Sequence, residues 1–213
     1  MKIGVFDSGK GGEFIAAGLG ELLPEHEYLV VNDREHVPYG SRSDEEVTVL
    51  TLAAIQPLLA ARCDIIVIAC NSATMAAIAT LRTTYPTVAF VGIEPMVKPA
   101  AAISKSGHIA MLATPLTLHS PRYQQLRTQY ASTLTVTEPD TTGWAAHIEY
   151  DTPDSISFSE LNDTVGNGCD VLVLACTHYL ALRTRLARAF PNVLILEPTE
   201  AIARQITALA ARH

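Results

Sequence analysis

Two segments of the chain, 106 residues apart, repeat one pattern. Residues 63–72 read CDIIVIACNS and residues 169–178 read CDVLVLACTH, with Cys, Asp, Val, Ala and Cys at the same offsets. Each contains a short apolar run of β-branched residues and Leu, which is typical of a strand buried on both faces of a parallel sheet. A stretch with helical character follows each run. The repeat therefore predicts two related α/β units.

The repeat extends beyond these two strands. A strand-like segment closed by Glu-Pro follows each helical stretch, at residues 86–95 and 191–198. The first strand of the chain, at residues 2–9, has a looser match at residues 107–117. The pattern thus covers most of the chain, and it indicates that the two units have the same order of elements.

Apolar strands alternate with amphipathic helices along the chain, as expected of βαβ units with a parallel sheet. One such helix is predicted over residues 43–63, where Ser43 is the N-cap and acidic residues fill the first turn. We predict an α/β fold of two pseudo-symmetric parallel-sheet domains. The first comprises residues 1–95 with 199–213, and the second comprises residues 96–198.

Composition excludes several classes of protein. The chain has 213 residues and a formal net charge of -7, without the basic patch that a nucleic-acid surface needs. No apolar run reaches the roughly 18 residues that span a bilayer, and Asp7 lies where a signal peptide has its apolar centre. We therefore expect a cytoplasmic protein that binds neither nucleic acid nor membrane.

The cysteines and histidines predict no metal site. The four cysteines form two C-x6-C pairs, which is not the close spacing of a zinc site, and the seven histidines are scattered. In a cytoplasmic chain the thiols are expected to be reduced. The four cysteines are Cys63, Cys70, Cys169 and Cys176.

The first loop resembles a phosphate-binding loop but lacks one part of it. Gly4, Gly9 and Lys10 fit the pattern G-x-x-x-x-G-K-[ST], yet Gly11 stands where the pattern needs a hydroxyl for Mg²⁺. Asp7 would also repel a triphosphate. We interpret the loop as an acidic loop at the end of a strand.

Polar residues follow four of the predicted strands. Parallel α/β sheets bind ligands outside the carboxyl ends of their strands, so we expect these residues to gather at one site. If the two units face each other, Cys70 and Cys176 lie on opposite sides of one cleft. The residues at the four strand ends are Asp7 and Ser8; Cys70, Asn71 and Ser72; Thr114 and Thr117; and Cys176, Thr177 and His178.

Two facing thiols suit a reaction that inverts a stereocentre, because one removes a proton while the other delivers one to the opposite face. Asp7 is a candidate partner of Cys70, and His178 of Cys176. Purely structural roles for these residues stay open. A cysteine at a strand end is often a small apolar side chain, Asp7 fits a helix N-cap, and His178 fits a structural histidine. The small polar residues expected to hold a polar substrate are Ser8, Asn71, Ser72, Thr114, Thr117 and Thr177.

The motifs, taken together, resemble those of the cofactor-independent glutamate racemases of the Asp/Glu racemase superfamily. They occur in the order found in that family and span nearly the whole chain. The motifs are FDSGKGG (6–12), VPYGSRS (37–43), ACNSATM (69–75), GIEP (92–95), ATPLTLHSPRY (113–123) and ACTHYLAL (175–182).

The resemblance implies an active site between the two domains and a reaction without a cofactor, with D-glutamate for peptidoglycan as the product. Cys70 and Cys176 match the two acid/base catalysts. Asp7, His178 and, on a poorer local pattern, Glu149 match the residues that assist them. The positions that match substrate-binding residues are Asp7, Ser8, Tyr39, Gly40, Asn71, Ser72, Thr114, Thr117, Thr177 and His178.

Departures from the family pattern leave the substrate open. The chain is shorter than typical members, chiefly between about 123 and 165, and Lys10 and Ser72 replace the usual residues. An aspartate, hydantoin or other amino-acid racemase, or a catalytically idle binding homologue, therefore remains an alternative. The oligomeric state, with a homodimer as one option, is also open.

Overall fold

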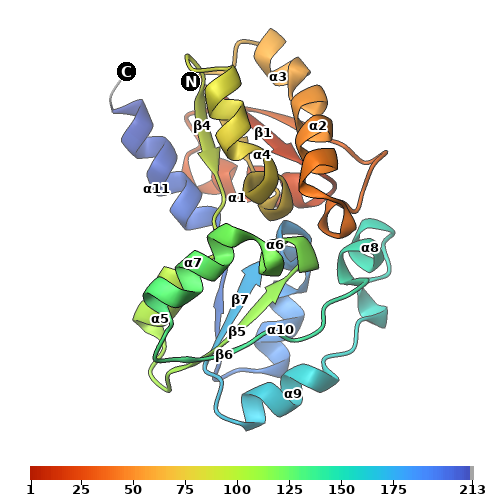
Figure 1. The fold of residues 1–213 in the computed structure, drawn as a ribbon, viewed down its shortest axis with the longest axis vertical. Helices are drawn as coiled ribbons and strands as arrows, with labels where there is room; N and C mark the ends of the chain where they lie inside the picture. Colours follow the sequence, from red (N-terminus) through yellow and green to blue (C-terminus); the bar gives the residue numbers. More distant parts are fainter. Residues whose placement is uncertain (212–213) are drawn as a thin grey trace.

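The computed structural model describes residues 1–211 and contains two four-stranded sheets, each wholly parallel (Figure 1). The strand orders are β2-β1-β3-β4 and β6-β5-β7-β8, so the two sheets share one topology, as the internal repeat predicts. The strands are β1 (Lys2–Asp7), β2 (Glu27–Asn32), β3 (Ile65–Ile68), β4 (Ala89–Gly92), β5 (His108–Ala113), β6 (Thr135–Thr137), β7 (Val171–Ala175) and β8 (Leu194–Leu196).

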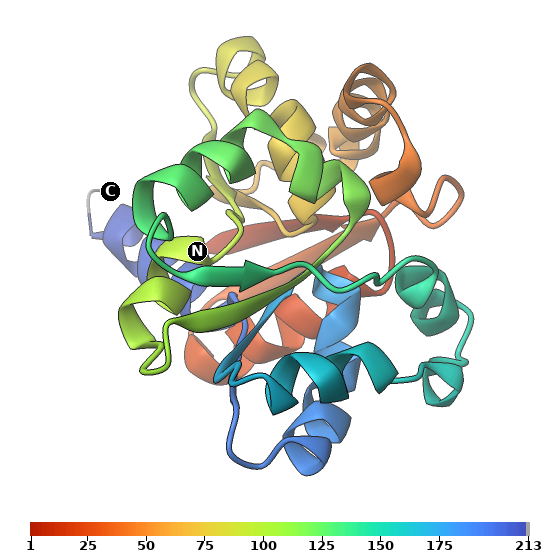
Figure 2. The same ribbon diagram turned by 60° about the horizontal axis from the view of Figure 1, so that its bottom comes forward.

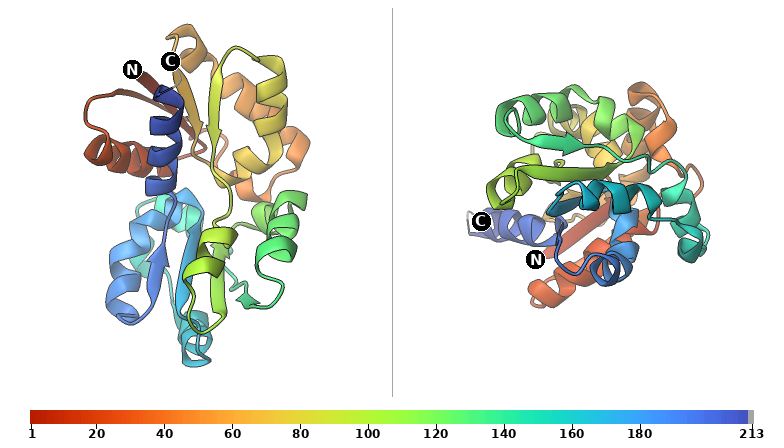
Figure 3. Two further views of the ribbon diagram at one scale, coloured as in Figure 1. Left: turned by 90° about the vertical axis from the view of Figure 1, so that its left-hand side faces the viewer. Right: turned by 90° about the horizontal axis from the view of Figure 1, so that it is seen from below.

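The first half of the molecule is built on the sheet of β1 to β4. Its central strands β1 and β3 are buried on both faces because their apolar side chains pack under helices on either side. Helix α11, the last in the chain, packs against α1 and β4 of this half (Figure 3). The helices of the first half are α1 (Gly11–Leu22), η1 (Tyr39–Ser41), α2 (Asp44–Ala54), α3 (Gln56–Ala60), α4 (Asn71–Thr84) and α11 (Thr199–Ala210).

The second half is built on the sheet of β5 to β8. Trp144 and Phe158 pack on Tyr179 and Phe190 beneath this sheet, with ring centroids 5.6 to 6.3 Å apart. The division into domains at residues 95/96 and 198/199 stays a prediction. The helices of this half are α5 (Val97–Ile103), α6 (Pro115–His119), α7 (Pro121–Tyr130), α8 (Trp144–Glu149), η2 (Pro153–Ser155), α9 (Ser159–Gly166), η3 (Thr177–Leu182) and α10 (Arg183–Ala189).

Two predicted helices are interrupted. The helix expected over residues 43–63 is capped by Ser43, as predicted, but it divides into α2 and α3 just before Pro57, because proline cannot donate to the preceding turn. The helix expected after Cys176 begins as the 3₁₀ helix η3. Its first turn has the backbone bond from Tyr179 N–H to the carbonyl of Cys176, which is the tighter 3₁₀ spacing.

The repeat also has a structural role at the amino ends of β3 and β7. Asp64 precedes β3, and its carboxylate accepts the backbone N–H of Lys2 at 2.7 Å. Asp170 precedes β7, and its carboxylate accepts the backbone N–H groups of Lys105 and Ser106 at 2.7 and 2.8 Å. Asp64 therefore bonds the start of β3 to the start of its neighbour β1. Asp170 bonds the start of β7 to the segment that precedes its neighbour β5.

Within residues 1–211 no helix is both long and apolar enough to cross a membrane.

Replacing Ile66 by alanine tests the core of the first half. Ile66 on β3 is fully buried, so Ile66→Ala is expected to lower the free energy of unfolding by about 2–5 kcal/mol, from lost burial and the cavity left behind. Urea unfolding followed by circular dichroism measures the change. The matched control is Val49→Ala on α2, whose side chain is 65% exposed and whose loss should change stability by less than about 0.5 kcal/mol. Equal effects at the two positions would contradict this description of the core.

Candidate active site

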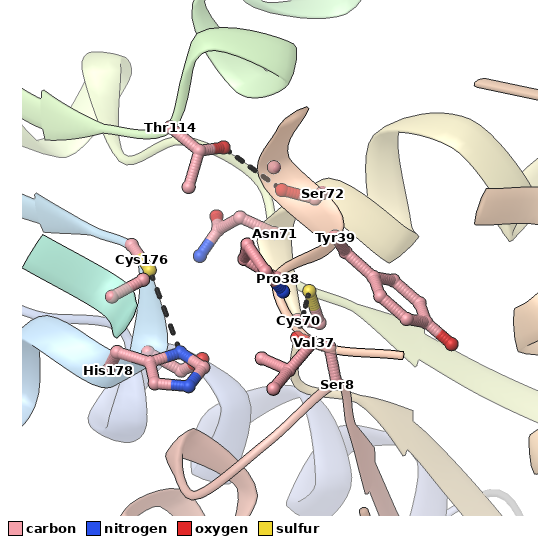
Figure 4. Close-up of a pocket in the computed structure, with 13 residues that line it drawn as sticks. Ser8, Val37, Pro38, Tyr39, Cys70, Asn71, Ser72, Thr114, Cys176 and His178 are labelled. Carbon is pink, nitrogen blue, oxygen red and sulfur yellow. Dashed lines mark hydrogen bonds between the residues drawn. The ribbon is translucent and has the colours of Figure 1, made fainter. Parts of the chain in front are cut away.

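A cavity lies where the carboxyl ends of the two sheets meet, and residues from both halves line it (Figure 4). Cys70 follows β3 and Cys176 follows β7, so the two thiols lie on opposite sides of the cavity. This is the facing arrangement that the sequence analysis offers as a hypothesis. The lining residues are Ser8, Val37, Pro38, Tyr39, Gly40, Cys70, Asn71, Ser72, Thr114, Ala145, Cys176, Thr177 and His178.

Cys70 lies at the N-cap of α4. Its sulfur accepts the backbone N–H of Ala73 at 3.4 Å and lies 3.4 Å from the hydroxyl of Ser8. Burial, and next the negative charge of Asp7, raise the pKa of the Cys70 thiol to about 12, while the bonds from Ser8 and Ala73 act in the opposite direction. The thiol is therefore protonated at neutral pH in the unliganded protein.

Cys176 begins a chain of three buried side chains. Its sulfur lies 3.9 Å from Nδ1 of His178 (Figure 4). On the other side of the ring, Nε2 of His178 lies 3.0 Å from Oε2 of Glu149. With Nε2 donating to the carboxylate, Nδ1 of a neutral imidazole is free to accept the thiol proton. Burial raises the pKa of the Cys176 thiol, and next to burial the negative charge of Cys70, when that thiol is ionised, raises it further. The histidine and the carboxylate thus give this thiol a route for its proton.

Asp7 occupies the end of β1 and is fully buried. Its carboxylate accepts the backbone N–H of Gly9 at 2.9 Å and the hydroxyl of Thr177, from the other half, at 2.7 Å. Burial raises its pKa, opposed first by the charge of His178. Asp7 does not cap α1, which has no side-chain cap, and it makes no hydrogen bond to Cys70. Its effect on that thiol is through charge alone.

The polar lining of the cavity comes from both halves. Asn71 is buried, and within residues 1–211 both polar atoms of its side chain lack a hydrogen-bond partner, so they are available to a ligand. Ser72 and Thr114 share a hydrogen bond of 2.9 Å across the halves. The phenol of Tyr39 points away from the cavity and donates to Asp33 at 2.6 Å (Figure 4).

Three predicted site residues do not line the cavity. Asp7 and Glu149 lie behind the lining residues, and Thr117 is fully buried behind Thr114, to which it is bonded. Sequence reasoning missed three lining residues. Val37 and Pro38 belong to the VPYG motif, which could have identified them. Ala145 belongs to no motif that could have done so. Ala145 and Glu149 both belong to the region between about 123 and 165, which is shorter than in typical family members. This shortened region therefore still reaches the cavity.

Lys10 takes no part in the cavity lining. Its ammonium group pairs with Asp151 at 2.6 Å, and its backbone N–H donates to Glu149 at 2.8 Å. Its charge therefore serves a contact between the two halves, outside the cavity.

The cavity is narrow. It leaves only about 20 Å³ for the centres of water-sized spheres, which is close to the minimum for a single water. An amino acid is much larger, so residues that line the cavity have to move before one can enter.

Comparisons with known proteins show the family and the fold that the chain shares. The Asp/Glu/Hydantoin racemase family model matches residues 13–206. The chain is 38% identical to a glutamate racemase of Ectopseudomonas mendocina, over 99% of this chain and 82% of that protein. Among solved structures, the glutamate racemase of Escherichia coli in complex with L-glutamate and an activator has a TM-score of 0.85 at 26% identity, over 98% of this chain and 81% of that one. A glutamate racemase isoform of Bacillus anthracis has a TM-score of 0.81 at 27% identity, over 99% and 81%.

Alkylation tests the state of the thiol at Cys70. Only the thiolate reacts with iodoacetamide, and the pKa of Cys70 is raised to about 12, so its alkylation rate should still be rising at pH 10. Peptide mass spectrometry measures the rate at each pH, and circular dichroism verifies that the protein is folded there. A rate that levels off below pH 9 would contradict the raised pKa.

Proposed function

The chain belongs to the Asp/Glu/Hydantoin racemase family, and we propose that it is a glutamate racemase that interconverts L- and D-glutamate without a cofactor. The observation that carries the proposal is the position of Cys70 and Cys176 on opposite sides of one cavity. A carbon held between two thiols can lose a proton to one and gain a proton from the other. The configuration at that carbon is inverted as a result.

On one side of the reaction, Cys176 gives its proton to Nδ1 of His178 and becomes the thiolate that removes the Cα proton of one enantiomer. Glu149 keeps Nε2 of His178 protonated, which leaves Nδ1 as the acceptor. Cys70 then donates its thiol proton to the opposite face of the carbon. A positioned acid or base of this kind contributes about 10²–10⁴-fold in rate.

In the reverse direction Cys70 removes the proton. Its sulfur has the backbone N–H of Ala73 and the hydroxyl of Ser8 as partners, and both stabilise a thiolate. The charge of Asp7 opposes the thiolate. The two thiols are therefore supported by different groups, although they do the same chemistry.

Substrate carboxylates meet donors from both halves, most of them on the first. Asn71 has a free amide, and the N-terminus of α4, which begins at Asn71, presents backbone N–H groups that favour an anion. Ser8, Ser72 and Thr114 add hydroxyl groups. These groups support an acidic amino acid as the substrate.

The proposal also covers where the reaction takes place and what its product is used for. The substrate is a free amino acid in the cytoplasm, and the D-glutamate serves peptidoglycan synthesis. A homodimer is a further prediction, which sedimentation velocity tests.

An aspartate or hydantoin racemase is the second candidate, because the family description includes those substrates. A catalytically idle homologue is less well supported, since both thiols and the His178–Glu149 pair are in contact distance of the cavity or its lining.

Exchange in D₂O tests the function. The protein is incubated with L-glutamate, and separately with L-aspartate, without added cofactor, while optical rotation and Cα deuteration are followed. We expect inversion of glutamate, reduced by about 10²–10⁴-fold in Cys70→Ser and in Cys176→Ser, because each variant lacks one acid/base group. Inversion of aspartate alone would retain the mechanism and change the substrate, whereas exchange with neither amino acid would overturn the assignment. Cys169→Ser, at a buried thiol outside the cavity, is the matched control.

A further inference from the structure

Cations of the first half meet a short acidic segment of the second half beside the cavity. Helix α8 lies next to the segment that follows β2 (Figures 1 and 2). Arg34, in that segment, has its Nε 3.6 Å from Oε1 of Glu149 and its terminal nitrogen 2.6 Å from Glu13. Lys10 pairs with Asp151, two residues beyond Glu149. None of these contacts belongs to the cavity lining.

Glu149 is a buried carboxylate with a complete set of partners. Its side chain is 4% exposed. One oxygen, Oε2, accepts the backbone N–H of Lys10 at 2.8 Å and faces Nε2 of His178 at 3.0 Å. The other, Oε1, lies 3.6 Å from Nε of Arg34. The side chain of Arg34 is 48% exposed and pairs with Glu13 as well, so it brings a cation from the first half to a buried carboxylate of the second. A buried charge that loses its counter-charge is disfavoured.

We propose that Arg34 is a positioning residue for catalysis, which acts from the first half by neutralising Glu149 and thereby keeps His178 free to take the proton of Cys176. The inference rests on the proposed function. Arg34 and Glu149 belong to different halves, so this support for His178 comes across the interface between them.

The charges around His178 determine whether removal of Arg34 strengthens or weakens its hold on a proton. The groups that face it are Asp7 from the first half, Glu149 from α8 and Cys176 from the end of β7. Glu13 and Asp151 add negative charge through the contacts with Arg34 and Lys10. Without Arg34 this set is more negative, so His178 holds a proton more tightly. A protonated His178 cannot accept the proton of Cys176, and activity is lost at the acidic side first.

The test compares Arg34→Met with the wild type. We expect the acidic limb of the pH profile of kcat/KM for glutamate to move up by roughly one unit, so that kcat/KM at pH values on that limb falls by up to about tenfold. Arg34→Lys, which keeps the charge, should recover most of the activity. Arg204→Met removes an exposed arginine paired on α11 and should change neither quantity.

Two further measurements separate positioning from general damage. With Cα-deuterated glutamate, Arg34→Met should increase the isotope effect for the enantiomer that Cys176 deprotonates and decrease it for the other, because only one proton transfer is slowed. In a Glu149→Gln background, Arg34→Met should have no further effect, since the group it neutralises is absent. Equal changes for both enantiomers, or additive losses in the double variant, would overturn the inference.

A measurement that does not depend on enzymatic activity distinguishes the proposed role of Arg34 from the proposed racemase function. Histidine-selective NMR follows the pH at which His178 gains its proton, and this pH should rise by roughly one unit in Arg34→Met and stay unchanged in Arg204→Met. If the wild type inverts no amino acid, the proposed function fails while the NMR titration still decides the role of Arg34. If the wild type inverts glutamate and Arg34→Met matches it in every measurement, only this inference fails.

Discussion

The buried carboxylate of Asp7 is the contact on which the arrangement of the two halves depends. An unpartnered buried carboxylate is costly, and one of its two partners, Thr177, belongs to the other half. Helix α1 can approach Thr177 only because Gly11 has no side chain, since a Cβ there would overlap the threonine. The same contact brings the end of β1 against the end of β7. The opposition of the two thiols follows from it.

The two halves have the same fold, but the groups that contact the two thiols differ. Cys176 has a histidine and a carboxylate behind it, whereas Cys70 has a hydroxyl and a backbone amide. The sheets repeat because their strand sequences repeat. The partners differ because Glu149 comes from α8, between β6 and β7, whereas the matching region of the first half, between β2 and β3, folds as η1, α2 and α3.

The strands and the gathering of their carboxyl ends could be predicted from the sequence, because apolar runs and polar residues after them are local signals. The direction of side chains could not. The phenol of Tyr39 turns to Asp33, and Thr117 lies behind Thr114, since neighbours distant in sequence compete for each hydroxyl. Ala145 and Arg34 reach the site region from segments without a motif, and only the packing of α8 against the first half reveals them.

The aspartates that precede β3 and β7 lie at the far ends of their sheets from the cavity, yet they occur at matching positions and both bind backbone N–H groups. Selection for two opposed thiols gives no reason for this likeness, since neither Asp64 nor Asp170 touches the site. The likeness belongs to the architecture of the sheets, because the central strand of each half is anchored at its amino end by the same type of contact, a carboxylate that accepts backbone N–H groups.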